Sequence, residues 1–147
     1  MTATGIDPRG PRFTATVTLV VFAVALLLSD AAPGVAAVLT GVQAALFAIG
    51  AGLGVQKTPT GLFFRSVVRP RLTPPAELED PAPPRFAQAV GLVFAVVATI
   101  GFATGAVLLG QVFAGFAFVA AFLNAVFGFC LGCEMYLLGA RLRGRPA

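Results

Sequence analysis

The residues best suited to chemistry lie together near the end of the 147-residue chain. Cys130 and Cys133 are its two cysteines, and Glu134 directly follows the second. On one regular helix, at about 100° per residue, all three side chains share a face. The two Cα atoms then lie about 5 Å apart, which a disulfide permits. The spacing indicates a thiol redox pair, with Glu134 as the candidate proton partner.

Two other interpretations of the cysteines stay open. If the last apolar segment is one continuous helix, the pair lies near its C-terminus and beside a carboxylate, and both features oppose ionisation of a thiol. A zinc site needs more ligands than two cysteines, and the chain has no histidine, so only a symmetric dimer would complete one. The alternatives are therefore packing of the thiols, redox or sulfur handling, and metal or cluster binding across a dimer. We expect no cofactor and no metal site within one chain.

The composition places these residues in a membrane protein. The chain is 58% hydrophobic and 11% charged, whereas soluble domains are about a quarter charged. Charged residues are absent over residues 13–29, 31–56 and 86–133. The last of these runs is too long for one membrane span of about 20 residues, and it divides best near Leu109-Gly110-Gln111. The sequence predicts an all-α bundle of four transmembrane helices over 13–29, 35–55, 86–109 and 111–138, as one membrane domain covering residues 1–147.

The basic residues predict the orientation of this bundle. All ten fall on one side of the predicted spans, whereas Asp30 is the one charge on the other side. The positive-inside rule therefore places both termini and the central connection, residues 57–85, in the cytoplasm. These ten residues are Arg9, Arg12, Lys57, Arg65, Arg69, Arg71, Arg85, Arg141, Arg143 and Arg145.

The central connection contains a short amphipathic segment. Thr58 can cap a helix that begins at Pro59, and Phe63 and Phe64 then lie opposite Arg65. Such a helix lies in the headgroup plane of a membrane. Its basic residues are candidates for contact with lipid headgroups or for docking of a partner protein, and a proline-rich linker, residues 73–84, follows. The candidate docking residues of the connection are Lys57, Arg65, Arg69, Arg71 and Arg85.

Other patterns carry less weight. A cleavable signal peptide would also begin with basic residues and an apolar run, but Pro33 lies close to the cleavage position. The segment 50–58 resembles a phosphate-binding loop, yet Gln56 stands where that loop needs glycine. Nucleic-acid binding is not expected because no basic face with interleaved aromatic residues is present. Three pairs of glycines spaced by four indicate close helix packing within a chain or between chains. These pairs are Gly50 and Gly54, Gly101 and Gly105, and Gly128 and Gly132.

Four segments of the chain resemble an uncharacterised bacterial membrane family called domain of unknown function 4395. The most specific is Phe127-Gly128-Phe129-Cys130-Leu131-Gly132-Cys133, and the others are residues 5–13, 70–72 and 83–88. The resemblance implies a small integral protein of the bacterial inner membrane, with Cys130 and Cys133 as its functional pair. It also implies a role near thiol redox or sulfur metabolism, because genes of the family lie near those of thioredoxin-like and rhodanese-type proteins.

Three functional hypotheses follow. The first is an accessory membrane protein whose Cys130 and Cys133 exchange electrons or sulfane sulfur with a soluble thioredoxin-like or rhodanese-like partner. The second is a structural or scaffolding subunit without chemistry of its own, which assembles through its glycine-rich helix faces. The third is a small permease for an anion or a sulfur species. The residues alone do not decide whether the protein is an enzyme.

Overall fold

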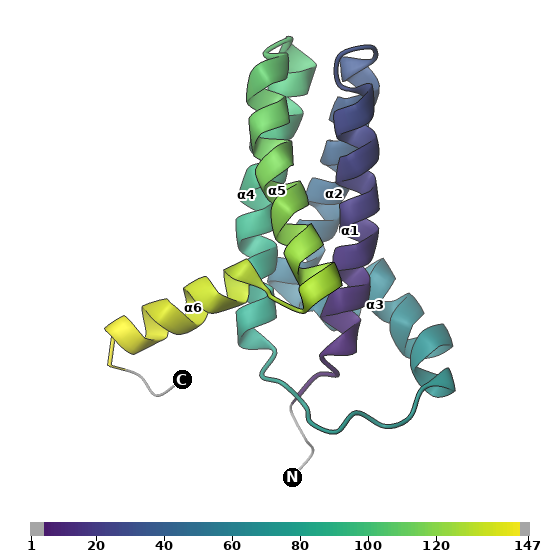
Figure 1. Ribbon diagram of the computed structural model, residues 1–147, viewed down its shortest axis with the longest axis vertical. Coiled ribbons are helices and arrows are strands. Elements are labelled where there is room, and N and C mark those ends of the chain that lie inside the picture. Colours follow the sequence, from purple (N-terminus) through teal and green to yellow (C-terminus); the bar gives the residue numbers. More distant parts are fainter. Residues whose placement is uncertain (1–4, 145–147) are drawn as a thin grey trace.

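The computed structural model describes residues 5–144, which form a helical bundle without a named strand in that part of the chain. Four long helices run side by side, namely α1 (Arg9–Leu28), α2 (Pro33–Leu53), α4 (Ala82–Thr104) and α5 (Val107–Phe127) (Figure 1). Each is long and apolar enough to cross a membrane. The predicted all-α bundle with four apolar helices is therefore confirmed, and it is compatible with a multi-pass membrane protein.

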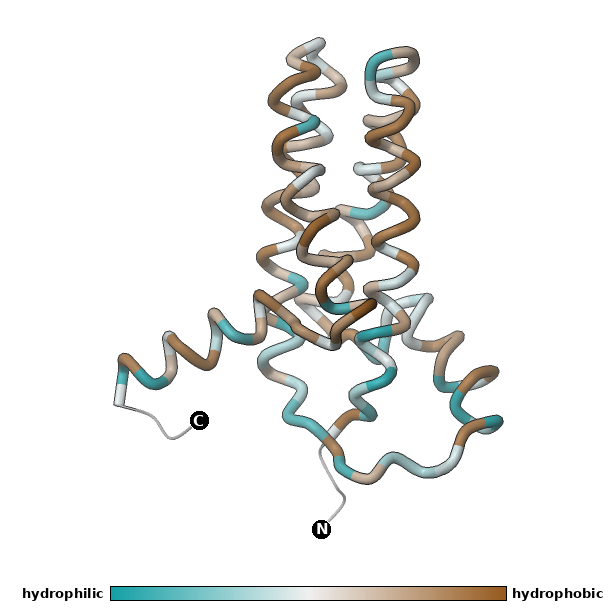
Figure 2. The backbone as a smooth tube through the Cα atoms, viewed as in Figure 1, coloured by the Kyte–Doolittle hydropathy of each residue, from teal (hydrophilic) through white to brown (hydrophobic). Residues whose placement is uncertain are grey.

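Small side chains hold the four helices together. The core consists of Phe22, Phe47 and Phe102 surrounded by alanines of all four long helices. Between a fifth and a third of each apolar helix is buried within the bundle, so most of its apolar surface faces outward. Figure 2 shows hydrophobic residues along the length of the long helices. In lipid this outward face needs no cover, and close backbone packing supplies the association.

The turn between α4 and α5 lies earlier than the sequence suggested. We expected a division near Leu109-Gly110-Gln111, whereas α4 ends at Thr104 and Gly105 adopts a left-handed conformation with φ +85°. Gly110 is instead a packing residue, because a Cβ there would collide with the ring of Phe102. Glycine therefore has two roles in this segment, and only the one at 105 forms the turn.

The fourth span is also shorter than predicted. The expected helix over 111–138 is divided at Gly128, whose φ of +67° ends α5. The N–H groups of Gly128 and Phe129 donate to the carbonyls of Asn124 and Leu123, which satisfies the end of the helix. After this turn α6 (Leu131–Leu142) projects sideways from the bundle (Figure 1). The division is hidden in the sequence because α6 keeps an exposed apolar face, as an interfacial helix does.

The central connection forms the expected interfacial segment. A short turn (Val55–Lys57) is followed by α3 (Pro59–Phe63), which continues as a π-helical turn (Phe64–Val68) and a final 3-10 turn (Arg69–Arg71). Thr58 caps α3, since its hydroxyl accepts a hydrogen bond of 3.0 Å from the Gly61 N–H. The residues from Leu72 to Asp80 form no helix.

The fold contains an internal repeat that our sequence reasoning missed. The pattern Asp-Pro-x-x-Pro-Arg-Phe occurs at residues 7–13 and again at 80–86, immediately before or within the starts of α1 and α4. In each half two long helices are followed by a shorter helix, α3 or α6, at the same end of the bundle (Figure 1). Phe13 stacks on Phe63 in the first half, and Phe86 packs on Tyr136 in the second, both with ring centroids 5.8 Å apart.

Contacts between the halves are reciprocal. Arg12 at the start of α1 donates to the carbonyls of Ala125 and Val126 at the end of α5, while Arg85 at the start of α4 donates to Ala51 and Gly52 at the end of α2. Equivalent backbone positions, Ile6 and Glu79, exchange two hydrogen bonds of 2.9 Å. The halves are thus related by an approximate two-fold axis along the bundle, and each half satisfies helix-end carbonyls of the other.

Candidate functional site

The two cysteines lie at the N-terminus of α6. Cys130 is the residue that precedes the helix, in an extended conformation, and its Sγ accepts a hydrogen bond of 3.3 Å from the Cys133 N–H. The two residues form a disulfide, and their Cα atoms are 5.2 Å apart, as the spacing predicted. Cys130 thus occupies the capping position that Ser, Thr, Asn or Asp usually fills.

The observed position of the cysteine pair is the opposite of the one expected from the sequence. The sequence placed the pair near a helix C-terminus, where the helix dipole opposes a thiolate. Because α5 ends at Gly128 and a new helix begins at Leu131, the pair instead lies at the positive end of α6, where a thiolate on Cys130 would be favoured. Glu134 is exposed in the first turn of α6, and it does not line the cavity next to Cys130.

Close packing on α4 sets the direction of α6. A Cβ at Gly132 would stand 2.6 Å from the Cα and Cβ of Ala87, so only glycine allows this approach. Four residues further along α6, Tyr136 packs against Phe86. The guanidinium of Arg12 lies beside Gly128, where it binds the last carbonyls of α5. These contacts hold the beginning of α6 under the bundle, with Cys130 directed toward its interior.

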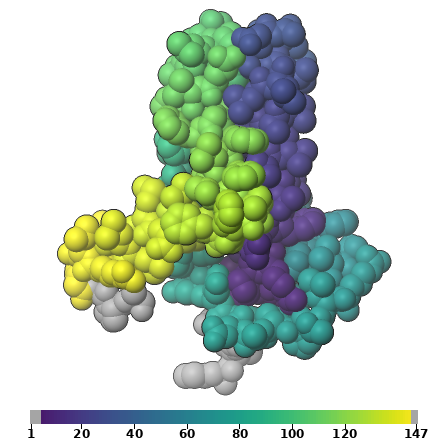
Figure 3. All heavy atoms as spheres, in the orientation of Figure 1, coloured from purple at the N-terminus to yellow at the C-terminus, as the bar shows by residue number. Residues whose placement is uncertain are grey.

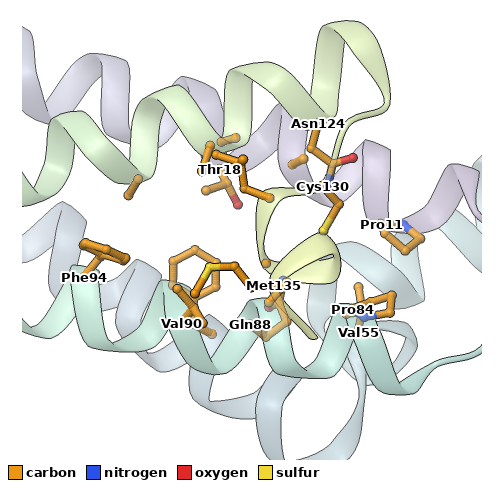
Figure 4. A pocket seen from close by; sticks show the side chains of 18 of the residues that line it. Pro11, Thr18, Val55, Pro84, Gln88, Val90, Phe94, Asn124, Cys130 and Met135 are labelled. Atoms are coloured by element: carbon orange, nitrogen blue, oxygen red, sulfur yellow. The ribbon is translucent and has the colours of Figure 1, made fainter. Parts of the chain in front are cut away.

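Cys130 lines a cavity of about 230 Å³ between α1, α4, α5 and α6. Its wall is mostly apolar, and its polar side chains are Thr18, Gln88 and Asn124. Figure 4 shows these residues around the cavity, with Phe94 at one end and Pro11 and Pro84 at the other. On one continuous helix, as the sequence predicts, Asn124 would lie about 120° from Cys130 and face a different interface. That expectation is wrong, because the turn at Gly128 divides the helix, and both residues line the same cavity.

The candidate docking residues divide into different environments. Lys57 and Arg71 are exposed, whereas Arg85 is engaged with the carbonyls that end α2. Arg65 and Arg69 line a second cavity of about 400 Å³ beside the N-terminal segment. The structure therefore leaves four of the five basic residues without a helix-capping role.

Asp7 anchors that second cavity. Its carboxylate accepts hydrogen bonds from the backbone N–H and the guanidinium of Arg9, and the Nε of Arg69 lies 3.8 Å away. The side-chain hydrogen bonds from Arg9 hold the pKa of Asp7 below its usual value, against the opposing effect of burial. Arg9 also donates to the Thr73 carbonyl, so this cluster ties the N-terminal segment to the central connection.

The glycine pairs take part in packing within the chain. Gly50 approaches Gln88, Gly101 approaches the backbone of Gly110, and Gly132 approaches Ala87. The other member of each pair, Gly54, Gly105 or Gly128, has a positive φ at the end of a long helix. Within residues 5–144, no group of three or more His, Cys, Asp or Glu side chains could hold a metal ion.

These features define a small helical protein with four helices able to cross a membrane and a paired-cysteine site at one end of the bundle. The model of the family described as domain of unknown function (DUF4395) matches residues 6–141. The chain therefore belongs to this family. Comparisons with curated proteins and with solved structures found no match.

Proposed function

We propose that this protein is a membrane-anchored thiol–disulfide exchange protein, with Cys130 and Cys133 as its redox pair and a soluble thioredoxin-like protein as its partner. The observation that carries the proposal is the position of the pair. Both cysteines lie at the N-terminus of a helix, where the Cys133 N–H already binds the Cys130 sulfur. Reactive cysteines in redox proteins gain their thiolate character from this kind of surrounding.

The first half of the repeat shows that the fold does not require sulfur here. At the equivalent place, Thr58 caps α3 through the Gly61 N–H, as Cys130 caps α6 through the Cys133 N–H. A hydroxyl is a stronger acceptor than sulfur, so threonine would serve the cap better. A disulfide that closes a loop of four residues stabilises a protein by only about 2 kcal/mol in the chain-entropy model. Structure alone therefore gives little reason for two cysteines.

The exchange proceeds in two balanced steps. The Cys130 thiolate attacks a disulfide sulfur of the partner, a mixed disulfide forms, and the other partner sulfur leaves as a thiolate. Cys133, after losing its proton, then attacks the Cys130 sulfur and releases the second partner thiolate. The partner gains two electrons, and the Cys130–Cys133 disulfide is restored. The same steps in reverse reduce the pair at the expense of the partner.

The charge distribution supports an orientation for this reaction. The described basic residues belong to the starts of α1 and α4, to the central connection and to α6, at one end of the bundle (Figure 1), whereas Asp30 follows α1 at the opposite end. By the positive-inside rule, that end and both termini face the cytoplasm of a bacterial inner membrane. Disulfides in the cytosol are usually transient and catalytic, which agrees with a redox role for the pair. The exposed residues Lys57 and Arg71 offer a docking surface for an acidic partner.

Trapping of the mixed disulfide tests the proposal. The protein is reconstituted in lipid vesicles, reduced, and mixed with an oxidised soluble thioredoxin-like protein. Cys133→Ser cannot complete the second step, so it should accumulate a mixed disulfide on Cys130, seen as a mass shift on a non-reducing gel. Wild type resolves this intermediate, and Cys130→Thr, which keeps the helix cap, should form none. Equal yields from Cys133→Ser, Cys130→Thr and wild type would overturn the proposal.

The same variants distinguish transfer of a sulfur atom from transfer of electrons. If a rhodanese-like donor of sulfane sulfur is the partner, Cys133→Ser gains one sulfur atom on Cys130 without a lasting bond to the donor. Intact mass after incubation distinguishes this persulfide from the mixed disulfide. The double variant Cys130→Thr, Cys133→Ser tests the alternative of a scaffolding subunit. If this variant replaces the wild type in the cell without loss of function, the cysteines are not needed and the scaffolding role is favoured.

A further inference from the structure

We propose that the cavity beside Cys130 binds the ring of a lipid-soluble quinone, which exchanges two electrons with the Cys130–Cys133 pair. The inference rests on the proposed redox function and names the second reaction partner. Its starting point is that Cys130 of the redox pair lines a partly open cavity within the bundle. A small molecule from the lipid can enter this cavity and reach the sulfur from inside the bundle.

The cavity opens to the outside of the bundle. Phe116, Leu131 and Met135 line it and are exposed. They lie on α5 and α6, so the cavity is open on the side of the bundle where α6 begins. Apolar residues around a lateral opening favour a ligand that arrives from the hydrocarbon region rather than from water.

Size and shape agree with a substituted aromatic ring. A dry cavity of about 150 Å³ accommodates benzene, so about 230 Å³ leaves room for a ring that carries several substituents. The wall extends along α4 from Pro84 to Phe94, about 15 Å at the rise of an α-helix. Phe47, Phe94 and Phe116 supply flat apolar surfaces, as a planar ring prefers.

Polar groups in the wall match the two carbonyl oxygens of a quinone. The amides of Gln43 and Gln111 are bound to side chains of α1 and of the turn that follows it. Gln88 and Asn124 form no such bond with a described residue, and both residues line the cavity, where the Gln88 amide also packs against Gly50. An amide in an apolar wall is costly unless it is paired. A quinone offers two acceptors to these donors, which an acyl chain does not.

The reaction balances without a further reagent. The two thiols of the reduced pair lose their protons and two electrons, and a sulfur–sulfur bond forms. The quinone takes up two electrons and two protons, and each carbonyl oxygen becomes a hydroxyl. Together with the exchange reaction, the pair would pass electrons between a soluble dithiol and the membrane quinone pool.

Reduced protein in vesicles, kept free of oxygen, provides the test. The probes are decyl-ubiquinone and tetramethyl-benzoquinone, because thiols cannot add to a fully substituted ring. Wild type should lose both free thiols while an equal amount of quinol forms. Asn124→Leu should react about tenfold more slowly, the effect of one lost hydrogen bond. Gln111→Leu, the same change at the opposite end of α5, should react as wild type does.

Binding is measured separately on the Cys130→Thr, Cys133→Ser variant, which cannot react. Tyr136 is the only tyrosine and the chain has no tryptophan, so intrinsic fluorescence reports on α6 next to the cavity. Quinone should quench it saturably. Ala120→Phe, which fills the cavity, should abolish the saturable part, and Ala103→Phe on the exposed face of α4 should not.

Three results would overturn the inference. These are no thiol loss with either quinone, equal behaviour of Ala120→Phe and Ala103→Phe, or equal competition by decylbenzene, which would identify an acyl chain as the occupant. The mixed-disulfide experiment is independent of all three. A protein that is trapped with a thioredoxin-like partner but ignores quinones keeps the proposed function and loses only this inference.

Discussion

Gly132 and Gly139 form a matched pair on α6 for which the same substitution should have opposite effects. At Gly132 an alanine Cβ would stand 2.6 Å from Ala87, about 1 Å closer than ordinary carbon contacts allow. Overpacking of this kind typically costs about 1–3 kcal/mol. At Gly139 nothing lies within 4 Å of an added Cβ, so alanine there gains up to about 1 kcal/mol of helix propensity. We therefore expect Gly132→Ala to loosen α6 from α4 and Gly139→Ala to leave it docked or strengthen it.

Tyr136 fluorescence measures this directly. Its ring packs on Phe86 of α4, and no other tyrosine or tryptophan contributes. Acrylamide should quench Tyr136 more strongly in Gly132→Ala than in wild type, and hydrogen exchange along α6 should be faster. In Gly139→Ala both should equal wild type or decrease. If Gly132→Ala and Gly139→Ala give the same quenching, α6 does not dock through Gly132, and the placement of Cys130 at the cavity loses its support.

Two further predictions use residues that differ in their partners. Asp7→Asn should lose about 2–4 kcal/mol because a nearly buried carboxylate leaves its arginine partners, whereas Asp80→Asn keeps an exposed cap on Ala82 and should change little. Because folding lowers the pKa of Asp7, its contribution to the free energy of unfolding is complete above pH 5, about one unit above the unfolded pKa, and is lost as pH falls through the folded pKa. Denaturation of wild type and Asp7→Asn at a series of pH values checks this. If the unfolding free energies of the two proteins change with pH in the same way, the prediction is wrong. Arg85→Ala should lower the free energy of unfolding by about 1–2 kcal/mol, because the last carbonyls of α2 lose their hydrogen bonds from Arg85. Lys57→Ala should cost nothing measurable, and equal thermal midpoints for the two variants would refute the capping role of Arg85.

The sequence predicted the membrane bundle well because the number of charged residues and their positions along the chain can be read without knowledge of the packing. It also predicted α3, since Thr58 and Pro59 are a strong start signal. It failed at Gly105 and Gly128, because the chain offers many glycines and only backbone geometry separates a turn from a packing contact. The repeated Asp-Pro-x-x-Pro-Arg-Phe pattern was a visible signal. An alignment of the two halves places Thr58 opposite Leu131, the residue after Cys130, and would have put the cysteines at the start of a helix.

The cavity could not be predicted from the helical periodicity of the sequence. Asn124 and Cys130 meet there only because the chain turns between them, and Gln88 joins them from another helix. Helical wheels describe neighbours within one helix. A site built across a turn needs the direction of α6, and that direction depends on the contact of Gly132 with Ala87.

The basic docking residues and the cysteines lie on different short helical segments. Arg65 and Arg69 belong to the segment that continues α3, whereas the cysteines begin α6, and the two segments leave opposite sides of the bundle (Figure 3). A protein partner bound to the basic residues reaches the disulfide only if it covers the whole end of the bundle between them.

This arrangement distinguishes large from small reductants. Reduction by a thioredoxin-like protein should slow severalfold in an Arg65→Ala, Arg71→Ala variant and at high salt, because steering of a charged partner is screened. Glutathione needs no such surface and should reduce the disulfide of this variant and of wild type at the same rate. If both reductants slow equally, the substitutions act on the cysteine site itself, and the basic connection is not a docking surface. A thioredoxin-like protein that is indifferent to charge would instead approach the pair from the side of α6, where the first turn exposes Glu134 and leaves an acidic rather than a basic approach.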